Sequence, residues 1–277
     1  MPELPEVETV RLGLEEHLVG RSVRDVVVTG RRTIRRQEIS EFEHELCGTT
    51  LTAARRRGKY LLLDLDGKDV LVIHLRMSGQ LRLAPPGAAV EAHSHVRISL
   101  DSGDELRFVD PRTFGECFVT DALDARRVPL VLAGLGRDPL VDGVAPRDLV
   151  ALLERRRCAL KAFLLDQSAI CGIGNIYADE ICFSARLSPL KRTETVSFAH
   201  ATRLATAIDE VLLAAVKAKG SSLRDLRYRD LMGGLGSFQE QHAAYDREGL
   251  ACPRCGRPIS RGRVVGRSTY FCRRCQR

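Results

Sequence analysis

Near the start of the chain, apolar residues recur at the spacing of an amphipathic helix. Between residues 6 and 19, four of them fall three or four positions apart, so they share one helical face. These residues are Val7, Val10, Leu14 and Leu18. Pro5 suits a first helical turn, the acids Glu6 and Glu8 suit the positive end of the helix dipole, and Gly20 is a natural stop. We therefore predict a helix over residues 6–19, which leaves Pro2 and Glu3 unexplained.

The pattern from residue 23 to about residue 121 is typical of strands. Its segments are short, apolar or alternating, and they are separated by Gly, Asp or Pro. The clearest segments read VRDVVV, KYLLLDLD, DVLVIHLRM, HVRISLD, ELRFVD and ECFVTD. Many short strands joined by turns predict an antiparallel sandwich or barrel.

From about residue 130 the spacing of apolar positions becomes helical. Helices are predicted in PRDLVALLER, LKAFLLDQ and YADEICFSARL, and a long amphipathic helix over residues 201–219 ends at Gly220. A glycine-rich stretch, DLMGGLGSF, follows, and the last 26 residues are basic and contain cysteines. The order of these segments predicts an α+β chain with several domains.

Length and cysteine use narrow the class of protein. A chain of 277 residues can hold about two domains with cores of their own. No apolar run approaches the roughly 20 residues of a membrane span, and no signal-peptide pattern opens the chain. The nine cysteines are an odd number, and five of them are scattered without framework spacing. We therefore expect a reducing, cytosolic setting.

The charge of the chain is modestly positive and comes almost entirely from arginine. Its formal net charge is +7, with 37 Arg against 6 Lys. Arginine is the better bidentate partner for phosphate, so the excess favours a polyanion such as a nucleic acid. Because lysine is so rare, each lysine deserves a specific explanation.

Four cysteines near the end have the spacing of a metal site. Cys252 and Cys255 form one CxxC pair, and Cys272 and Cys275 form another after sixteen residues. Two such pairs can bring four thiolates to the corners of a tetrahedron, which favours structural zinc over a redox pair or an iron–sulfur cluster. The segment between them, predicted as a β-hairpin, carries four arginines without a balancing acid, either as a solvated face or for phosphate contact.

The segment GIGNIYADE lies between two predicted helices. It is either an ordinary helix–helix turn or a phosphate site, because it offers backbone N–H groups and the amide of Asn175 at a helix N-terminus. Lys161, on the preceding helix, could bring its ammonium to the same anion.

Several longer motifs together resemble those of the formamidopyrimidine-DNA glycosylase family. These motifs are PELPEVE, RGKYLLLDL, HLRMSGQL, DPRTFGECF, GLGRDPL, LLDQSAICGIGNIYADEICFSARLSP and CPRCG…GRSTYFCRRCQR. They run from residue 2 to residue 276 in the order expected for the family, whose bacterial members remove oxidised purines from DNA.

The resemblance implies an N-terminal antiparallel β-sandwich with a flanking helix, a helix–two-turn–helix domain and a C-terminal zinc finger. We place the catalytic sandwich domain at residues 1–130 and the helical DNA-binding domain at 131–223. A lesion loop and linker take residues 224–250, and the zinc finger takes 251–277. The resemblance also implies that DNA crosses a cleft between these domains.

The same resemblance gives Pro2 and Glu3 a function. After removal of the initiator methionine, the nitrogen of Pro2 is a secondary amine that attacks C1′ of the damaged nucleotide and forms a Schiff base. Glu3 is the implied acid–base residue, while Lys59 and Arg267 assist the β- and δ-eliminations through phosphate contacts. Glu6 either supports the terminus or is a simple first-turn acid.

A glycosylase must flip its target nucleotide out of the stack. Met77, Arg112 and Phe114 match the family's residues that fill the gap, although Met77 and Phe114 could instead belong to the core. Phosphate contacts are implied for a larger set: His74, His93, Arg112, Arg156, Lys161, Asn175 and Arg267. Arg224 is a candidate to face the flipped base.

Some positions depart from the family pattern. Arg76 stands where glycine is common and would put an extra cation beside Met77, and Thr113 stands where a basic residue is frequent. The stretch around residues 224–238 is glycine-rich and apolar where the family has a polar loop over the lesion. These changes bear on the range of bases that the protein excises.

The leading hypothesis is a bifunctional DNA glycosylase/AP lyase of base excision repair for 8-oxoguanine and formamidopyrimidines. The alternatives are an endonuclease VIII-like enzyme for oxidised pyrimidines, which Leu4 in PELPE disfavours, and a non-catalytic binder of damaged DNA. We expect one structural zinc ion, double-stranded DNA with oxidised bases or abasic sites as partner, and a monomer without membrane association. The expected location is the bacterial cytoplasm, at the nucleoid.

Overall fold

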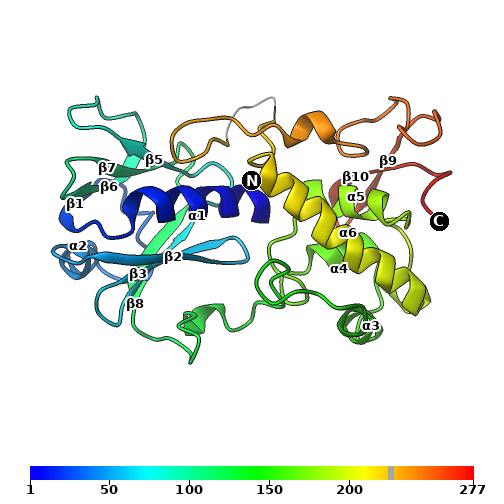
Figure 1. Ribbon diagram of the computed structural model, residues 1–277, viewed down its shortest axis with the longest axis horizontal. Coiled ribbons are helices and arrows are strands. Elements are labelled where there is room, and N and C mark those ends of the chain that lie inside the picture. The colour runs from blue at the N-terminus through cyan, green and yellow to red at the C-terminus, as the bar shows by residue number, and fades with distance from the viewer. Residues whose placement is uncertain (224–227) are drawn as a thin grey trace. The chain divides into compact units, whose positions relative to one another are not determined.

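Two four-stranded antiparallel sheets make up the first unit of the computed structural model, which describes residues 1–223 and 228–277. This unit comprises Met1–Ala133 and Ala218–Ser237. The strand orders are β1-β6-β7-β5 and β2-β3-β4-β8 (Figure 1). The strands are β1 (Val23–Val28), β2 (Leu51–Arg57), β3 (Tyr60–Leu65), β4 (Val70–His74), β5 (Gln80–Ala84), β6 (Ser94–Leu100), β7 (Glu105–Val109) and β8 (Glu116–Thr120).

Side chains from both sheets enter one apolar core. Along β6, buried residues alternate with half-buried ones, as expected of a strand with one face on a core. Leu61, Leu63 and Ile73 of one sheet belong to the same buried cluster as Val96 and Ile98 of the other. This confirms the predicted antiparallel sandwich.

Helix α1 (Leu4–Leu18) packs into that core along the predicted face. It begins two residues earlier than the spacing of apolar positions predicts. The reason lies at its N-terminus, where Glu3 and Glu6 form a capping box and Pro5 stands in the first turn. Leu4 is thereby drawn into the helix and is fully buried.

Helix α2 (Ile39–Leu46) interrupts a region that the sequence pattern predicts as strands throughout. Its buried residues, Phe42 and Leu46, stand four positions apart and contribute to the sandwich core. Glutamates fill much of the remaining helix surface, so the segment is too polar to alternate as a strand does. The period of 3.6 over only two turns is a weak signal next to the surrounding strands.

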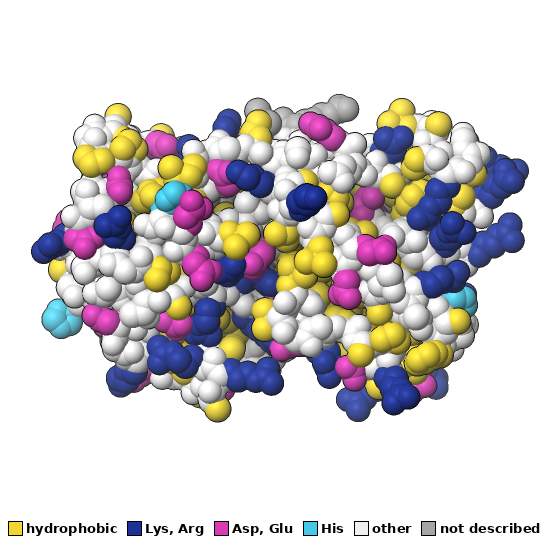
Figure 2. Space-filling view, viewed as in Figure 1, with side chains coloured by type: hydrophobic (Ala, Val, Ile, Leu, Met, Phe, Trp, Pro, Cys, Tyr) yellow, Lys and Arg dark blue, Asp and Glu magenta, His cyan; other side chains and the backbone are white. Residues whose placement is uncertain are grey.

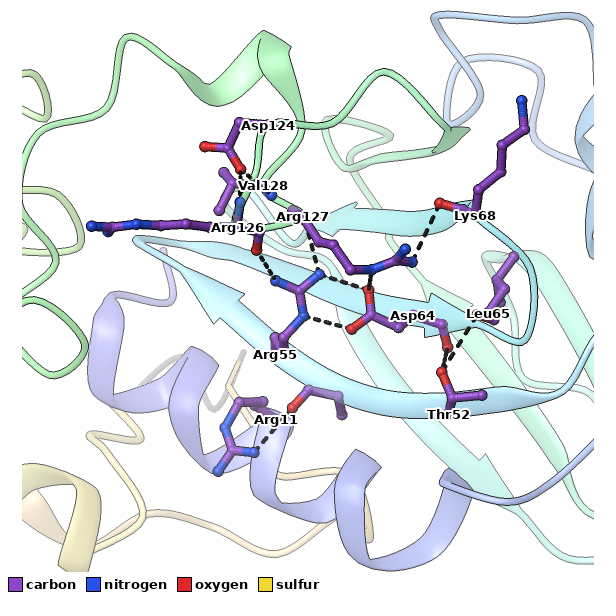
Figure 3. Close-up of polar contacts among 11 residues, drawn as sticks. Arg11, Thr52, Arg55, Asp64, Leu65, Lys68, Asp124, Arg126, Arg127 and Val128 are labelled. Carbon is purple, nitrogen blue, oxygen red and sulfur yellow. Dashed lines mark hydrogen bonds and ion pairs between the residues drawn. The ribbon is translucent and has the colours of Figure 1, made fainter.

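A buried carboxylate fastens the segment after β8 to the second sheet (Figure 3). Asp64 on β3 accepts two 2.6 Å bonds from the guanidinium of Arg55 on β2. Arg55 also donates to the carbonyl of Arg127 at 2.9 Å, and the Arg127 side chain lies 3.4 Å from Asp64. The loop itself is closed by Asp124, which accepts from two backbone N–H groups. Charge-assisted bonds of this kind hold a loop that has few apolar anchors.

The second unit comprises Gly134–Lys217 and Phe238–Arg277. It contains helices α3 (Pro146–Glu154), α4 (Leu160–Leu165), α5 (Asn175–Ser184) and α6 (Phe198–Lys217), and the hairpin β9 (Ser260–Val264) and β10 (Arg267–Phe271). Short 3₁₀ turns lie at η1 (Leu130–Leu132) in the first unit, and at η2 (Thr193–Thr195) and η3 (Phe238–Gln241) in the second.

Helix α5 is the central element of the second unit and is buried along almost its whole length. The long helix α6 ends near its predicted stop, and Gly220 just beyond it has φ +78°, a conformation that favours glycine. Within the described residues, no helix is long and apolar enough to cross a membrane. The four-part division of the chain drawn from its sequence stays a prediction.

Candidate active site and nucleic-acid interface

The N-terminal turn of α1 buries two carboxylates beside Pro2. Glu3 and Glu6 are only 3% and 2% exposed, and Pro2 is also buried. Oε2 of Glu6 accepts the backbone N–H of Glu3 at 2.8 Å. The bond fixes the backbone next to Pro2, so a group on residue 2 has a defined position rather than the mobility of a usual chain end.

The other oxygen of Glu6 holds the segment 218–237. Oε1 accepts the N–H of Ser221 at 2.7 Å, and the Tyr228 hydroxyl donates to the Glu6 carbonyl at 3.4 Å. A Cβ on Gly220 would come within 2.7 Å of Glu6 Oε1, so glycine is required there for space as well as for its positive φ. Glu6 thus joins the N-terminal turn to this segment, which is more than a simple first-turn acid would do.

Lys59 lies in the tight turn between β2 and β3 and is 7% exposed. The turn is built on Gly58, which has φ +59°. Arg56 donates to the Gly58 carbonyl at 2.8 Å and pairs with Glu8 of α1, also at 2.8 Å, through a side chain that is 1% exposed. This buried pair fixes the lysine turn against the N-terminal helix.

A single buried carboxylate organises two exposed turns. Asp110 has no exposed surface; its Oδ1 accepts from Ser78 Oγ at 2.5 Å and from the N–H of Arg112 at 3.2 Å. Its Oδ2 accepts the N–H of Gly115 at 2.7 Å. Asp110 therefore ties the turn that carries Met77 to the turn that carries Phe114.

The side chains on these turns face solvent. Met77 is 43% exposed and Phe114 is 42% exposed, so neither belongs to the core. The guanidinium of Arg112 lies 4.7 Å from the centre of the Phe114 ring, as in a cation–π contact. An adaptable thioether, a flat ring and a cation on rigid turns form a surface that suits nucleotide bases.

Two histidines neighbour these turns. His93 is exposed, has φ +66°, and its carbonyl accepts the N–H of Asp110 at 3.0 Å. His74, at the end of β4, is buried, and burial together with Arg76 lowers its pKa to about 3. Because Nδ1 of His74 accepts the N–H of Arg76 at 2.9 Å, the neutral ring carries its proton on Nε2. His74 can therefore donate one hydrogen bond but brings no charge.

Arg76 adopts a backbone conformation that fits the glycine common at this position in the family better than it fits arginine. Its φ is +53°, in the left-handed region where glycine is favoured. The guanidinium lies 3.3 Å from Glu116, which also binds Arg36 at 2.6 Å. Arg76 therefore shares one carboxylate with Arg36, so this cluster of two cations and one acid keeps a positive charge near Met77.

In the second unit, the glycine-rich turn before α5 is held by Gln167. Its side-chain amide donates to the Ile173 carbonyl at 2.8 Å, and its Oε1 accepts the N–H of Gly172 at 2.9 Å. Asn175 is the first residue of α5, and its buried Oδ1 has no hydrogen-bond partner among the residues that the structure describes. The amide stands at a helix N-terminus, as predicted for a phosphate site.

Lys161 does not fit the phosphate contact predicted for it. Its side chain is completely buried, with the ammonium 2.8 Å from Asp179 and 2.7 Å from the Ser268 carbonyl. Asp179 in turn accepts the N–H of Tyr270 at 2.9 Å, and burial raises its pKa to about 7 against the opposing effect of Lys161. The lysine is instead the internal link between α4, α5 and β10.

Arg156 is also engaged within the protein. It pairs with Asp166 at 2.8 Å and lies over the Phe163 ring. The neighbouring Arg155 and Arg157 are exposed, so they are better placed for an external anion. The phosphate contact predicted for Arg156 stays a prediction, and α3 ends at this three-arginine run, where the turn that follows sets the direction of each side chain.

Arg267 begins strand β10 and is exposed, directly after the Val265–Gly266 turn of the hairpin. Both turn residues have positive φ, as a two-residue hairpin requires. The position agrees with the hairpin predicted from the cysteine spacing. Arg224 lies outside the described residues.

The four C-terminal cysteines converge as their spacing predicts. Their sulfur atoms all lie within 4.8 Å of one another, with 3.9 Å between Cys252 and Cys275 and 3.5 Å between Cys255 and Cys272. A tetrahedron with zinc–sulfur bonds of about 2.3 Å has edges of about 3.8 Å. The donor set and its size therefore fit zinc, and all four cysteines are unpaired by disulfides.

Two buried acids, one in each unit, hold segments that carry predicted site residues, and neither is itself a predicted site residue. Asp110 lies within the motif DPRTFGECF and Glu180 within the predicted helix YADEICFSARL, and the sequence predicts no role for either. Both oxygens of Glu180 accept backbone N–H groups of residues 243–245, at 2.7 to 2.9 Å, which orients the chain leading to the cysteines. An acid amid apolar helix positions was the available signal, since a buried charge needs partners.

Comparison with known proteins agrees with this geometry. The sequence models of the formamidopyrimidine-DNA glycosylase N-terminal domain, its H2TH domain and the zinc finger found in FPG and IleRS match residues 1–117, 135–226 and 249–277. A formamidopyrimidine-DNA glycosylase of Xanthomonas euvesicatoria pv. vesicatoria is 44% identical over 278 residues, covering 100% of both chains.

Solved structures agree as well. The MutM (Fpg) protein of Thermus thermophilus is 42% identical with a TM-score of 0.87, covering 99% of this chain and 98% of that chain. Lactococcus lactis Fpg in complex with DNA containing N7-benzyl-Fapy-dG is 34% identical with a TM-score of 0.88, covering 100% of both chains.

The zinc-finger match and the cysteine geometry together assign one structural zinc ion to the four thiolates, where it would supply folding energy to a segment with few apolar residues. The three matched segments lie in the same order as the sandwich, the helical region and the cysteine hairpin of the structure. The chain therefore belongs to the formamidopyrimidine-DNA glycosylase family.

Proposed function

We propose that this protein is a bifunctional DNA glycosylase/AP lyase of base excision repair that removes oxidised purines, including 8-oxoguanine and formamidopyrimidines. The observation that carries the proposal is the buried N-terminal turn, where Glu6 holds the backbone of Glu3 and Glu3 stands directly beside Pro2. The family membership and the DNA in the L. lactis relative support it.

In this mechanism the initiator methionine is removed, and the secondary amine of Pro2 attacks C1′ of the damaged nucleotide. The bond from C1′ to the base nitrogen breaks and the base leaves with a proton; the C1′–O4′ bond then opens, O4′ takes a proton, and an iminium joins protein and sugar. Glu3 transfers the protons of ring opening and base loss. Loss of a C2′ proton expels the 3′ phosphate, a second elimination expels the 5′ phosphate, and hydrolysis of the remaining iminium restores the amine.

The remaining side chains have supporting roles in this proposal. Lys59 and Arg267 stabilise the phosphates that leave, and Glu6 keeps the terminus in place. Met77, Arg112 and Phe114 fill the space of the flipped nucleotide. His74, His93 and Asn175 donate hydrogen bonds to the backbone of the bound strand. The substrate is double-stranded DNA with an oxidised base or abasic site, bound by a monomer at the bacterial nucleoid.

Borohydride trapping tests this proposal. Incubation with an 8-oxoguanine duplex and borohydride should yield a covalent protein–DNA product, and peptide mapping should place the DNA on the nitrogen of residue 2. Pro2→Gly and Glu3→Gln should each reduce the trapped fraction at least tenfold, whereas Pro85→Gly, at an exposed turn, should not. Binding of the duplex without a trapped product would show a non-catalytic binder instead. Faster excision of thymine glycol than of 8-oxoguanine would refute the purine preference.

A further inference from the structure

A cavity of about 640 Å³ in the second unit is lined almost entirely by cationic side chains. The cations are Arg186, Lys191, Arg203, Arg254, Arg274 and Arg277. His200 and Cys275 complete the lining, and no acidic side chain contributes to it. Figure 2 shows Lys and Arg side chains gathered over the region of β9, β10 and the C-terminus in Figure 1.

The wall of this cavity is a fixed structure. Arg254 lies 4.3 Å from the centre of the Phe183 ring and donates to the Ser184 carbonyl at 3.2 Å. The buried Gln276 binds the Leu187 carbonyl at 3.0 Å and accepts the N–H of Cys272 at 2.7 Å. These bonds join the cysteine segment to the chain at and just beyond the end of α5, so two of the stretches that supply cations are fixed to each other.

The cations of this cavity have no acidic side chain as a partner. Within residues 1–223 and 228–277, no carboxylate lies within ion-pair distance of them. Gathering so many like charges is unfavourable unless something compensates for them. Four thiolates with one Zn²⁺ carry a net charge of −2, which is too small to balance six cations. The surplus positive charge therefore remains for an external anion.

We infer that this cavity is a binding site for a compact polyphosphate group. Its volume lies in the range of small-molecule pockets, and its arginines offer planar forks suited to phosphate oxygens. None of the residues that we assign to DNA contact lines it. A concave site of this size, open to solvent on one side, suits a short chain of phosphates, as in inorganic tripolyphosphate or a nucleoside triphosphate. The inference goes beyond the proposed function and does not depend on it.

Calorimetric titration of the full-length, zinc-loaded protein with inorganic tripolyphosphate tests this inference. We expect one site per chain, and at least tenfold weaker binding in Arg203→Gln/Arg274→Gln. The matched control is Arg24→Gln/Arg147→Gln, which removes the same charge from exposed positions outside the cavity and should change binding less than twofold. Equal weakening in both variants, or no binding to the parent at 1 mM, would overturn the inference.

A second measurement tests whether the cavity binds a small polyphosphate or the phosphates of DNA. Affinity for an undamaged duplex is compared between the same two variants at one salt concentration, with and without tripolyphosphate. We expect the cavity variant and its control to lose duplex affinity equally, as for general charge. Competition by tripolyphosphate together with a selective loss in the cavity variant would assign the cavity to DNA and refute the small-ligand site. Zinc content and circular dichroism confirm that each variant is folded.

Discussion

Replacement of Asp110 by asparagine should separate base extrusion from the chemistry on the sugar. The carboxylate accepts bonds from Ser78, Arg112 and Gly115 and has no contact with solvent. Asparagine has the same shape but keeps only one acceptor oxygen. It retains two of these bonds at Oδ1 and turns an amide donor toward the N–H of Gly115.

The size of the effect follows from the bonds lost. A hydrogen bond to a charged group contributes about 1.5–3 kcal/mol, and a buried donor left facing another donor adds a desolvation cost. We therefore expect the turns carrying Met77 and Phe114 to be destabilised by about 3 kcal/mol. If extrusion of the nucleotide requires these turns to be ordered, this free energy adds to the activation barrier, and excision from a duplex slows by about 100-fold.

Single-turnover cleavage on two substrates checks this reasoning. Excision of 8-oxoguanine from a duplex should fall about 100-fold in Asp110→Asn, whereas cleavage of a single-stranded abasic site, which requires little extrusion, should change less than threefold. Asp66→Asn, at an exposed turn, is the control and should leave both rates unchanged. Equal losses on both substrates would refute a role in extrusion, and unchanged rates on both would refute the importance of the carboxylate.

Three further predictions concern stability. Lys161→Met leaves Asp179 buried without its cation and should lower the free energy of unfolding by about 3 kcal/mol in denaturant titrations. The double variant Lys161→Met/Asp179→Asn should regain at least half of the lost free energy. No loss of stability in the single variant would contradict the internal link. Because burial holds the folded pKa of His74 at about 3 against 6.5 in the unfolded chain, its stabilising effect is present above pH 6.5 and is lost as the pH falls from there toward 3. Unfolding of the parent should cost about 2 kcal/mol less at pH 5 than at pH 7 through this residue, and an equally steep pH dependence in His74→Asn would show that another group is responsible. Removal of zinc with a strong chelator should expose residues 250–277 to proteolysis while the first unit stays resistant; an unchanged cleavage pattern would contradict a structural role for the metal.

The sequence by itself determined the classes of local structure and the cysteine site. Periods of two and of 3.6 in apolar positions located α1, α6 and six of the eight sandwich strands, because these periods follow directly from which face is buried. The spacing of the CxxC pairs was enough to predict which four cysteines form the metal cluster, because the two cysteines of each pair lie in one short turn. The brief helix α2, with two buried residues among glutamates, was wrongly predicted as strand.

Tertiary structure alone decided how the polar residues are used. Lys161 looks like a phosphate ligand in the sequence, yet it is buried because α5 and β10 place Asp179 and a carbonyl around its ammonium. Asp110 joins two turns through its hydrogen bonds. The cationic cavity is lined by a few residues between positions 186 and 277 that are far apart in the sequence. Burial and charge pairing depend on which surfaces meet in space, and periodicity along a chain carries no information about those partners.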